Sequence, residues 1–176
     1  MEHFNKHPDA EVALVLCNNP NAYVIQRADN FEIPSHVFDK YEFTKTDTIL
    51  KLLKSMEIDL IVLAGFLWLI PENLLKAFPN QIINIHPALL PKYGGKGMYG
   101  DRVHQSVLDN KETESGITIH FVNENYDEGN ILFQATCPVL PGDSADSLAA
   151  RIHTLEHQHY PRIIEQVITS PATILN

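Results

Sequence analysis

Residues 46–64 read TDTILKLLKSMEIDLIVLA, and this stretch decides the fold class. Its apolar side chains recur at i, i+3, i+4 and i+7, at Ile49, Leu52, Leu53 and Met56. That spacing puts them on one face of a helix, so the pattern predicts an amphipathic helix over Thr46–Met56. The apolar run Leu60–Ala64 follows at strand length and is typical of a buried parallel strand. A helix that leads into such a strand indicates one step of an α/β fold.

Short apolar runs alternate with helical patterns along the rest of the chain. Strands are predicted at Glu11–Cys17, Ser35–Phe38, Gln81–His86, Gly116–Val122 and Ile131–Val139. Helices are predicted after the turn Asn18–Asn21 as far as Ala28, over Pro71–Phe78, over Arg102–Asn110, and from Ser144, where Pro161 is expected to kink or restart the helix. We therefore expect a Rossmann-like α/β fold with a mostly parallel sheet and helices on both faces. With 176 residues, 44% of them apolar, residues 1–176 are expected to form a single domain.

Composition argues against several classes of partner. The formal charge of −9 and the absence of any Lys/Arg run argue against nucleic acid and anionic membrane surfaces. No apolar segment approaches the roughly 20 residues of a membrane helix, and the N-terminus lacks a signal-peptide core. Cys17 and Cys137 form neither a ligand-spaced pair nor a disulfide framework. A soluble, cytoplasmic protein is expected.

Three polar residues suggest acyl-transfer chemistry. Asn84 and His86 lie at the C-terminal end of a predicted strand, where ligands bind in open α/β sheets. Asp127 lies in the turn between the last two predicted strands. Attack of an amine on a formyl group needs an oxyanion donor, a group that handles protons near neutral pH, and a carboxylate that sets its charge. Asn84, His86 and Asp127 supply those groups, and they are the predicted catalytic residues.

The chain resembles the phosphoribosylglycinamide formyltransferases, which are folate-dependent enzymes of purine synthesis. The resemblance rests on Asn84–Tyr93 (NIHPALLPKY), His120–Val122 and Asp127–Gly129 (DEG), in that order. It implies transfer of a formyl group from 10-formyltetrahydrofolate to the amine of glycinamide ribonucleotide, without a metal. Formyltransferases that act on methionyl-tRNA and formyltetrahydrofolate deformylases share the Asn, His and Asp. The flanking residues His86–Ala88 and Gly95–Gly100 are similar to the ribonucleotide enzymes.

The family resemblance also implies binding residues. The folate is expected to bind Phe66, Leu67, Trp68, Leu69, Ile70, Glu124, Asn125 and Tyr126. The ribonucleotide is expected to bind Tyr93, Gly94, Gly95, Lys96, Gly97 and Glu156. From its position one turn before Glu156, His153 is expected to approach the phosphate. A homodimer is compatible with the sequence.

One departure from the family pattern concerns the N-terminus. The family has a first strand and a Gly/Ser-rich turn whose backbone N–H groups hold the substrate phosphate. Here Met1–Pro8 matches the end of the first helix, and Glu11–Cys17 matches the second strand. We therefore expect an N-terminally shortened sheet that lacks about twenty residues of the pattern, from usual element lengths.

Alternative functions remain open. The chain could act as a formyltetrahydrofolate deformylase, or as a folate-binding module without turnover. The string His153–His157 (HTLEH) also matches the H-x-x-E-H pattern of inverted zinc peptidases, although the sequence marks no third zinc ligand. Taken singly, Asn84, His86 and Asp127 are also ordinary turn and core residues, so the hypothesis depends on their joint occurrence.

Overall fold

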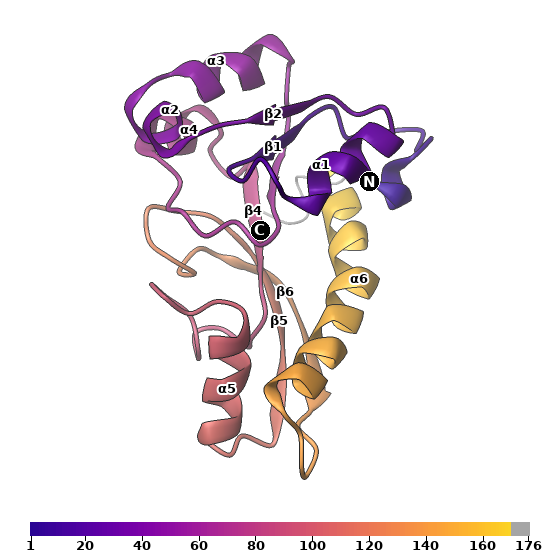
Figure 1. The fold of residues 1–176 in the computed structure, drawn as a ribbon, viewed down its shortest axis with the longest axis vertical. Helices are drawn as coiled ribbons and strands as arrows, with labels where there is room; N and C mark the ends of the chain where they lie inside the picture. The colour runs from indigo at the N-terminus through magenta and orange to yellow at the C-terminus, as the bar shows by residue number, and fades with distance from the viewer. Residues whose placement is uncertain (170–176) are drawn as a thin grey trace. The chain divides into compact units, whose positions relative to one another are not determined.

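The computed structural model describes residues 1–169, which divide into two compact units, one of residues 1–59 and one from Leu60 onward (Figure 1). The first unit contains η1 (Glu2–Phe4), β1 (Val15–Cys17), α1 (Tyr23–Asn30), β2 (Ser35–Val37), α2 (Lys40–Lys45) and α3 (Thr48–Ser55). The second contains β3 (Ile61–Leu63), α4 (Glu72–Ala77), β4 (Ile82–His86), α5 (Asp101–Asp109), β5 (Glu114–Phe121), β6 (Ile131–Pro138) and α6 (Ala145–Thr169). The prediction of a single domain over 1–176 stays a prediction.

The first unit pairs β1 with β2 in parallel, from Val15 opposite Ser35 to Cys17 opposite Val37. The predicted helix over Thr46–Met56 is present as α3, which buries Ile49 and Leu53. The predicted strand Glu11–Cys17 is shorter, because only its last three residues pair with β2. Within Met1–Pro8, predicted as the end of a helix, the structure has the short 3-10 helix η1.

The second unit contains a four-stranded sheet in the order β3-β4-β5-β6. β3 and β4 are parallel, whereas β4 pairs with β5 and β5 with β6 in antiparallel fashion. The prediction of a mostly parallel sheet is therefore wrong, because the observed sheet is mixed. The prediction failed because β5 is buried from Ser115 to Phe121 and so has the apolar composition of a parallel strand. It nevertheless runs antiparallel to both of its neighbours.

The core of the second unit lies between this sheet and α6, which packs against β5 and β6 and also against α5 (Figure 1). Its fully buried side chains include Ile83, Ile117, Ile119, Leu148 and Ile152. α6 continues through Pro161 as one helix, so the proline costs a backbone hydrogen bond without ending the helix. None of the helices formed by residues 1–169 is long and apolar enough to cross a bilayer.

Candidate active site

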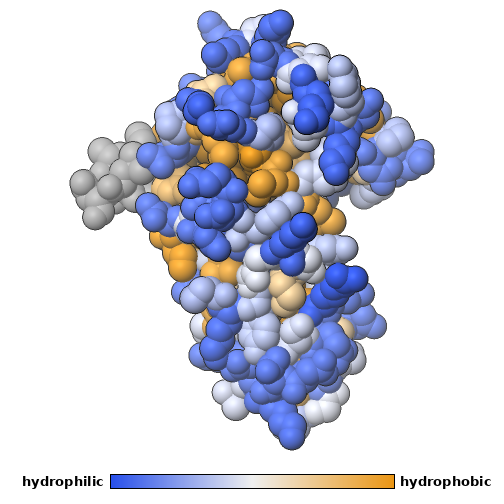
Figure 2. Space-filling view, turned by 90° about the vertical axis from the view of Figure 1, so that its left-hand side faces the viewer, coloured by the Kyte–Doolittle hydropathy of each residue, from blue (hydrophilic) through white to orange (hydrophobic). Residues whose placement is uncertain are grey.

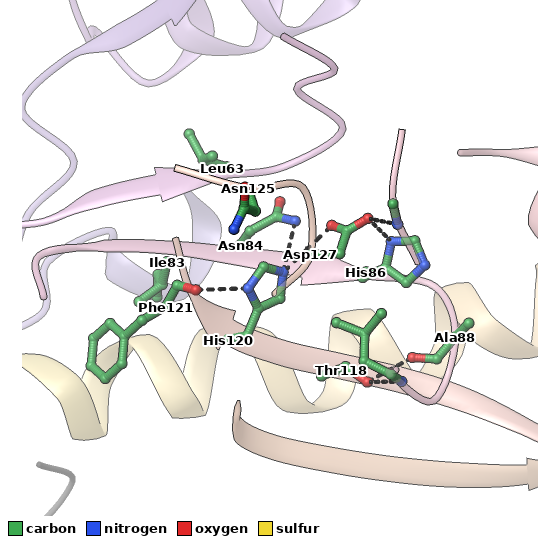
Figure 3. Close-up of polar contacts among 12 residues, drawn as sticks. Leu63, Ile83, Asn84, His86, Ala88, Thr118, His120, Phe121, Asn125 and Asp127 are labelled. Atoms are coloured by element: carbon green, nitrogen blue, oxygen red, sulfur yellow. Dashed lines mark hydrogen bonds and ion pairs between the residues drawn. The ribbon is translucent and has the colours of Figure 1, made fainter. Parts of the chain in front are cut away.

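β4 supplies the first two candidate catalytic side chains. Asn84 and His86 are two residues apart on this strand, so both side chains point to the same face of the sheet. β4 lies between β3 and β5 and pairs with both. Asn84 lies directly opposite His120 of β5. The side chains of Asn84, His86, His120 and Asp127 point toward one another (Figure 3).

His86 is held through its Nε2 atom. Its side chain is 4% exposed, and its Nε2 lies 2.7 Å from the backbone carbonyl oxygen of Tyr93. A carbonyl only accepts hydrogen bonds, so Nε2 carries a proton and donates it to Tyr93. The Nδ1 atom faces Asp127, at 3.5 Å from Oδ2. The proton that His86 gains or loses when it titrates is therefore the one on Nδ1.

Asp127 lies in the loop between β5 and β6, with a left-handed φ of 58° that Asp tolerates better than most residues. Its Oδ2 accepts a hydrogen bond from the backbone N–H of Gly95 at 2.9 Å. Its Oδ1 lies 3.7 Å from Nε2 of His120. The carboxylate thus contacts two imidazoles and one backbone donor.

The sequence interpretation missed His120 as part of this cluster. His120 is 2% exposed, and its Nδ1 donates to the carbonyl oxygen of Phe121 at 2.8 Å. In the neutral ring, Nε2 is then an acceptor and binds the Asn84 side-chain amide at 3.2 Å. One amide hydrogen of Asn84 is used in this way and the second is available to a ligand. An imidazole in the mostly apolar strand GITIHF was the signal that could have revealed His120.

Local backbone geometry places His120 and the Asp127 loop. The register of β5 against β6 shifts between Ile119 and His120, an irregularity often found beside active sites. Gly129 lies so close to β5 that a Cβ atom there would be 1.7 Å from the carbonyl oxygen of Phe121. That is the carbonyl that orients His120, so the absence of a side chain at Gly129 lets the Asp127 loop approach the strand end.

His86 and Asp127 each have a pKa below the ordinary value. Burial lowers the pKa of His86, and the nearby Asp127 carboxylate and the bond to Tyr93 oppose this shift only in part. For Asp127, burial alone would raise the pKa, but the His120 ring, the charge of His86 and the Gly95 N–H together lower it below the usual value. Near neutral pH the pair is therefore a largely neutral imidazole beside an ionised carboxylate.

The predicted folate residues lie on two segments. Phe66–Ile70 follows β3, where Leu67 and Leu69 are 48% and 41% exposed and Ile70 is buried. Phe66 and Trp68 pack edge to face, with ring centroids 5.9 Å apart. Glu124, Asn125 and Tyr126 immediately precede Asp127, with Glu124 and Asn125 exposed. Figure 2 shows that hydrophobic residues come to the surface in patches among hydrophilic ones.

The predicted ribonucleotide residues also lie on two segments. In the loop from Tyr93 to Gly97, Tyr93 and Gly95 supply the backbone contacts to His86 and Asp127 described above. His153 is exposed and Glu156 is half-buried, one turn apart on α6. Burial raises the pKa of Glu156, while the charges of His153 and His157 oppose the shift.

The zinc-peptidase alternative lacks a third ligand in the described part of the chain. Among residues 1–169, no group of three or more His, Cys, Asp or Glu side chains could hold a metal ion. His153 and His157 are both exposed on α6.

Comparison with known proteins identifies the family. The family model described as Formyl transferase matches residues 2–164. The chain belongs to the formyl transferase family. Among its relatives, the phosphoribosylglycinamide formyltransferase of Bacillus subtilis (strain 168) is 38% identical over 164 residues, which cover 91% of this chain and 82% of that protein.

Other members of the formyl transferase family extend the comparison. The chloroplastic phosphoribosylglycinamide formyltransferase of Vigna unguiculata is 42% identical over 159 residues, 88% of this chain and 51% of that protein. The chain spans about half the length of the plant relatives that it matches. The crystal structure of phosphoribosylglycinamide formyltransferase from Anaplasma phagocytophilum superposes with a TM-score of 0.87 at 31% identity, covering 96% of this chain and 79% of that one. The α/β formyltransferase fold expected from the sequence is therefore confirmed.

Proposed function

We propose that this chain transfers a formyl group from 10-formyltetrahydrofolate to the amine of glycinamide ribonucleotide. The observation that carries the proposal is the convergence of Asn84, His86 and Asp127 on one face of the sheet. The identity to relatives named phosphoribosylglycinamide formyltransferase supports this substrate pair over methionyl-tRNA.

In the proposed reaction, the amine nitrogen attacks the formyl carbon and the carbonyl oxygen becomes an oxyanion. The free amide hydrogen of Asn84 donates to this oxyanion, because His120 already holds the other one. Such a donor, held before the reaction starts, stabilises developing charge without reorganisation.

Proton transfer completes the proposed step. The attacking amine loses a proton as the new C–N bond forms, and the folate N10 must gain one as its bond to the formyl carbon breaks. Asp127 attracts the amine proton, directly or through water. This proton passes to Nδ1 of His86, because its Nε2 proton is committed to Tyr93, and the resulting imidazolium gives it to the folate N10. The ionised Asp127 beside it favours the transient imidazolium.

The binding residues belong to the same proposal. Folate lies against the apolar segment Phe66–Ile70, where Leu67 and Leu69 are exposed, and against the segment 124–126, which adjoins Asp127. The ribonucleotide lies along Tyr93–Gly97 and reaches His153 and Glu156 of α6. A homodimer and a cytoplasmic location stay predictions; the plant relatives are named as chloroplastic.

The test is to incubate the purified chain with 10-formyltetrahydrofolate, with and without glycinamide ribonucleotide, and to follow deformylated folate by absorbance. Turnover that requires the ribonucleotide is the expected result. Turnover without it would replace the proposal with a deformylase. Folate binding without any turnover by the folded chain would replace it with a folate-binding module.

A further inference from the structure

The loop after β4 touches both titrating catalytic groups through its backbone. The carbonyl oxygen of Tyr93 accepts from His86, and the N–H of Gly95 donates to Asp127. Both contacts depend on where the main chain of this loop lies, since neither uses a side chain of the loop. Something must therefore fix the loop between His86 and Tyr93.

Thr118 of β5 fastens the start of this loop (Figure 3). Its hydroxyl donates to the carbonyl oxygen of Ala88 at 2.7 Å and accepts from the N–H of Leu90 at 3.0 Å. Thr118 is fully buried, so these backbone groups have no ready access to water. A buried N–H or carbonyl left without a partner costs about 1–3 kcal/mol.

Gln134 lies on β6, the strand next to β5, and donates two further hydrogen bonds. Its side-chain amide nitrogen donates to the carbonyl oxygen of Leu90 at 3.0 Å and to the hydroxyl of Thr118 at 2.9 Å. The amide has two hydrogens, and each has one acceptor here. The Thr118 hydroxyl likewise uses its one hydrogen and both of its lone pairs. Rotation of either side chain would break at least one of these hydrogen bonds.

A role in folding stability alone does not account for the hydrogen bonds of Thr118 and Gln134. β5 tolerates a buried hydroxyl without a partner, since Ser115 is 2% exposed and its Oγ has no hydrogen bond among the described residues. Gln134 is exposed on the edge strand of the sheet, so it adds little to the core. Its two hydrogen bonds are directed to the loop and to the residue that holds the loop.

We propose that Thr118 and Gln134 are positioning residues, which hold the loop so that its backbone meets His86 and Asp127. Their effect on turnover rests on the formyl transfer proposed above, whereas their effect on the His86 ring does not. Thr118→Val removes the hydroxyl and keeps the side-chain volume. Gln134→Leu removes the amide donors at an exposed position, where folding should be retained. Ser115→Ala is the matched control, and Thr118→Ser is the rescue.

The direct measurement is the exchange rate of the His86 Nε2 proton by NMR of histidine-labelled protein without substrate, assigned by its loss in His86→Asn. In the wild type this proton should exchange slowly, because it is buried and bonded to Tyr93. In Thr118→Val and Gln134→Leu it should exchange roughly 10-fold faster, and kcat should fall on the order of 10-fold with the folate KM changed by less than about twofold. Thr118→Ser should restore both readouts, and Ser115→Ala should leave both unchanged.

An unchanged His86 proton in Thr118→Val and Gln134→Leu would overturn the positioning role, whatever happens to activity. The positioning role is also overturned if Ser115→Ala disturbs the His86 proton as strongly as these two variants do. If the wild type transfers no formyl group while the two variants still release the His86 proton, the proposed function fails and the positioning role stands.

Discussion

Replacement of Gly129 by alanine should disable the site from a position that carries no chemistry. The added Cβ would lie 1.7 Å from the carbonyl oxygen of Phe121, and contacts under 3.0 Å essentially do not occur, so the two chain segments must separate by about 1.3 Å. Asp127 lies two residues away on the moving segment, and its contact with His86 is only 3.5 Å. A misplacement of about 1 Å can cost on the order of 100-fold in rate.

The assay for Gly129→Ala is steady-state formyl transfer, with thermal unfolding measured in parallel. Overpacking should also destabilise the chain by about 1–3 kcal/mol, so a control with a similar loss of stability is needed. Gly142→Ala supplies it: Gly142 has a φ of +85° in the turn before α6 and open space around it, so alanine adds strain of about 1–2 kcal/mol away from the site. Normal kcat in Gly129→Ala would refute the placement of Asp127, as would an equal loss in Gly142→Ala.

Three further outcomes are expected. Asn84→Ala and Asp127→Asn should each lower kcat by about 100-fold in the same assay, and near wild-type turnover in either would remove that residue from the mechanism. Burial lowers the pKa of His86 and of His104 below the ordinary value of 6.5. Below pH 6.5 the unfolded chain therefore binds more protons than the folded chain. The free energy of unfolding should then decrease as the pH falls through 6.5. Between about pH 7.5 and about pH 5.5, thermal unfolding should show a smaller loss of stability in His104→Leu than in the wild type. An equal loss in both would contradict the contribution of His104 to this pH dependence. Tyr160→Phe should destabilise the chain by about 1–3 kcal/mol and raise the folate KM. The reason is that the Tyr160 hydroxyl donates to the carbonyl oxygen of Leu63 at 2.8 Å, at the end of β3 and just before the predicted folate segment. An unchanged KM would show that this segment does not bind folate.

The helices and strands were predicted well, because the residue pattern that specifies each of them lies within a few neighbouring positions. The apolar spacing at Ile49, Leu52 and Leu53 belongs to α3, and the run around Ile83 is the buried strand β4. Strand direction was not predictable in the same way. It depends on which strand becomes the neighbour, and a strand buried on both faces has the same apolar composition in either direction, as β5 does.

The candidate site was predictable where a side chain carries the chemistry. Asn84, His86 and Asp127 could be selected by residue type and position, and the structure brings them together. His120 could not be assigned in this way, because its contact with Asn84 arises from the pairing register of β4 and β5. The carbonyl of Tyr93 was equally inaccessible, since every residue has a carbonyl and only the folded loop directs this one at an imidazole.

The backbone contacts from this loop determine which kind of mutagenesis can find them. An alanine scan removes side chains, so Tyr93→Ala leaves the Tyr93 carbonyl in place and can report that position as unimportant, whereas Gly95 has no side chain to remove. Homologues could likewise vary the side chain at position 93 and keep the same contact. An amide-to-ester exchange that removes the Gly95 N–H, or a one-residue insertion in the loop, would reveal the dependence. For an engineer who wishes to change the substrate, the length and path of this loop are the properties to preserve, and its side chains are open to redesign.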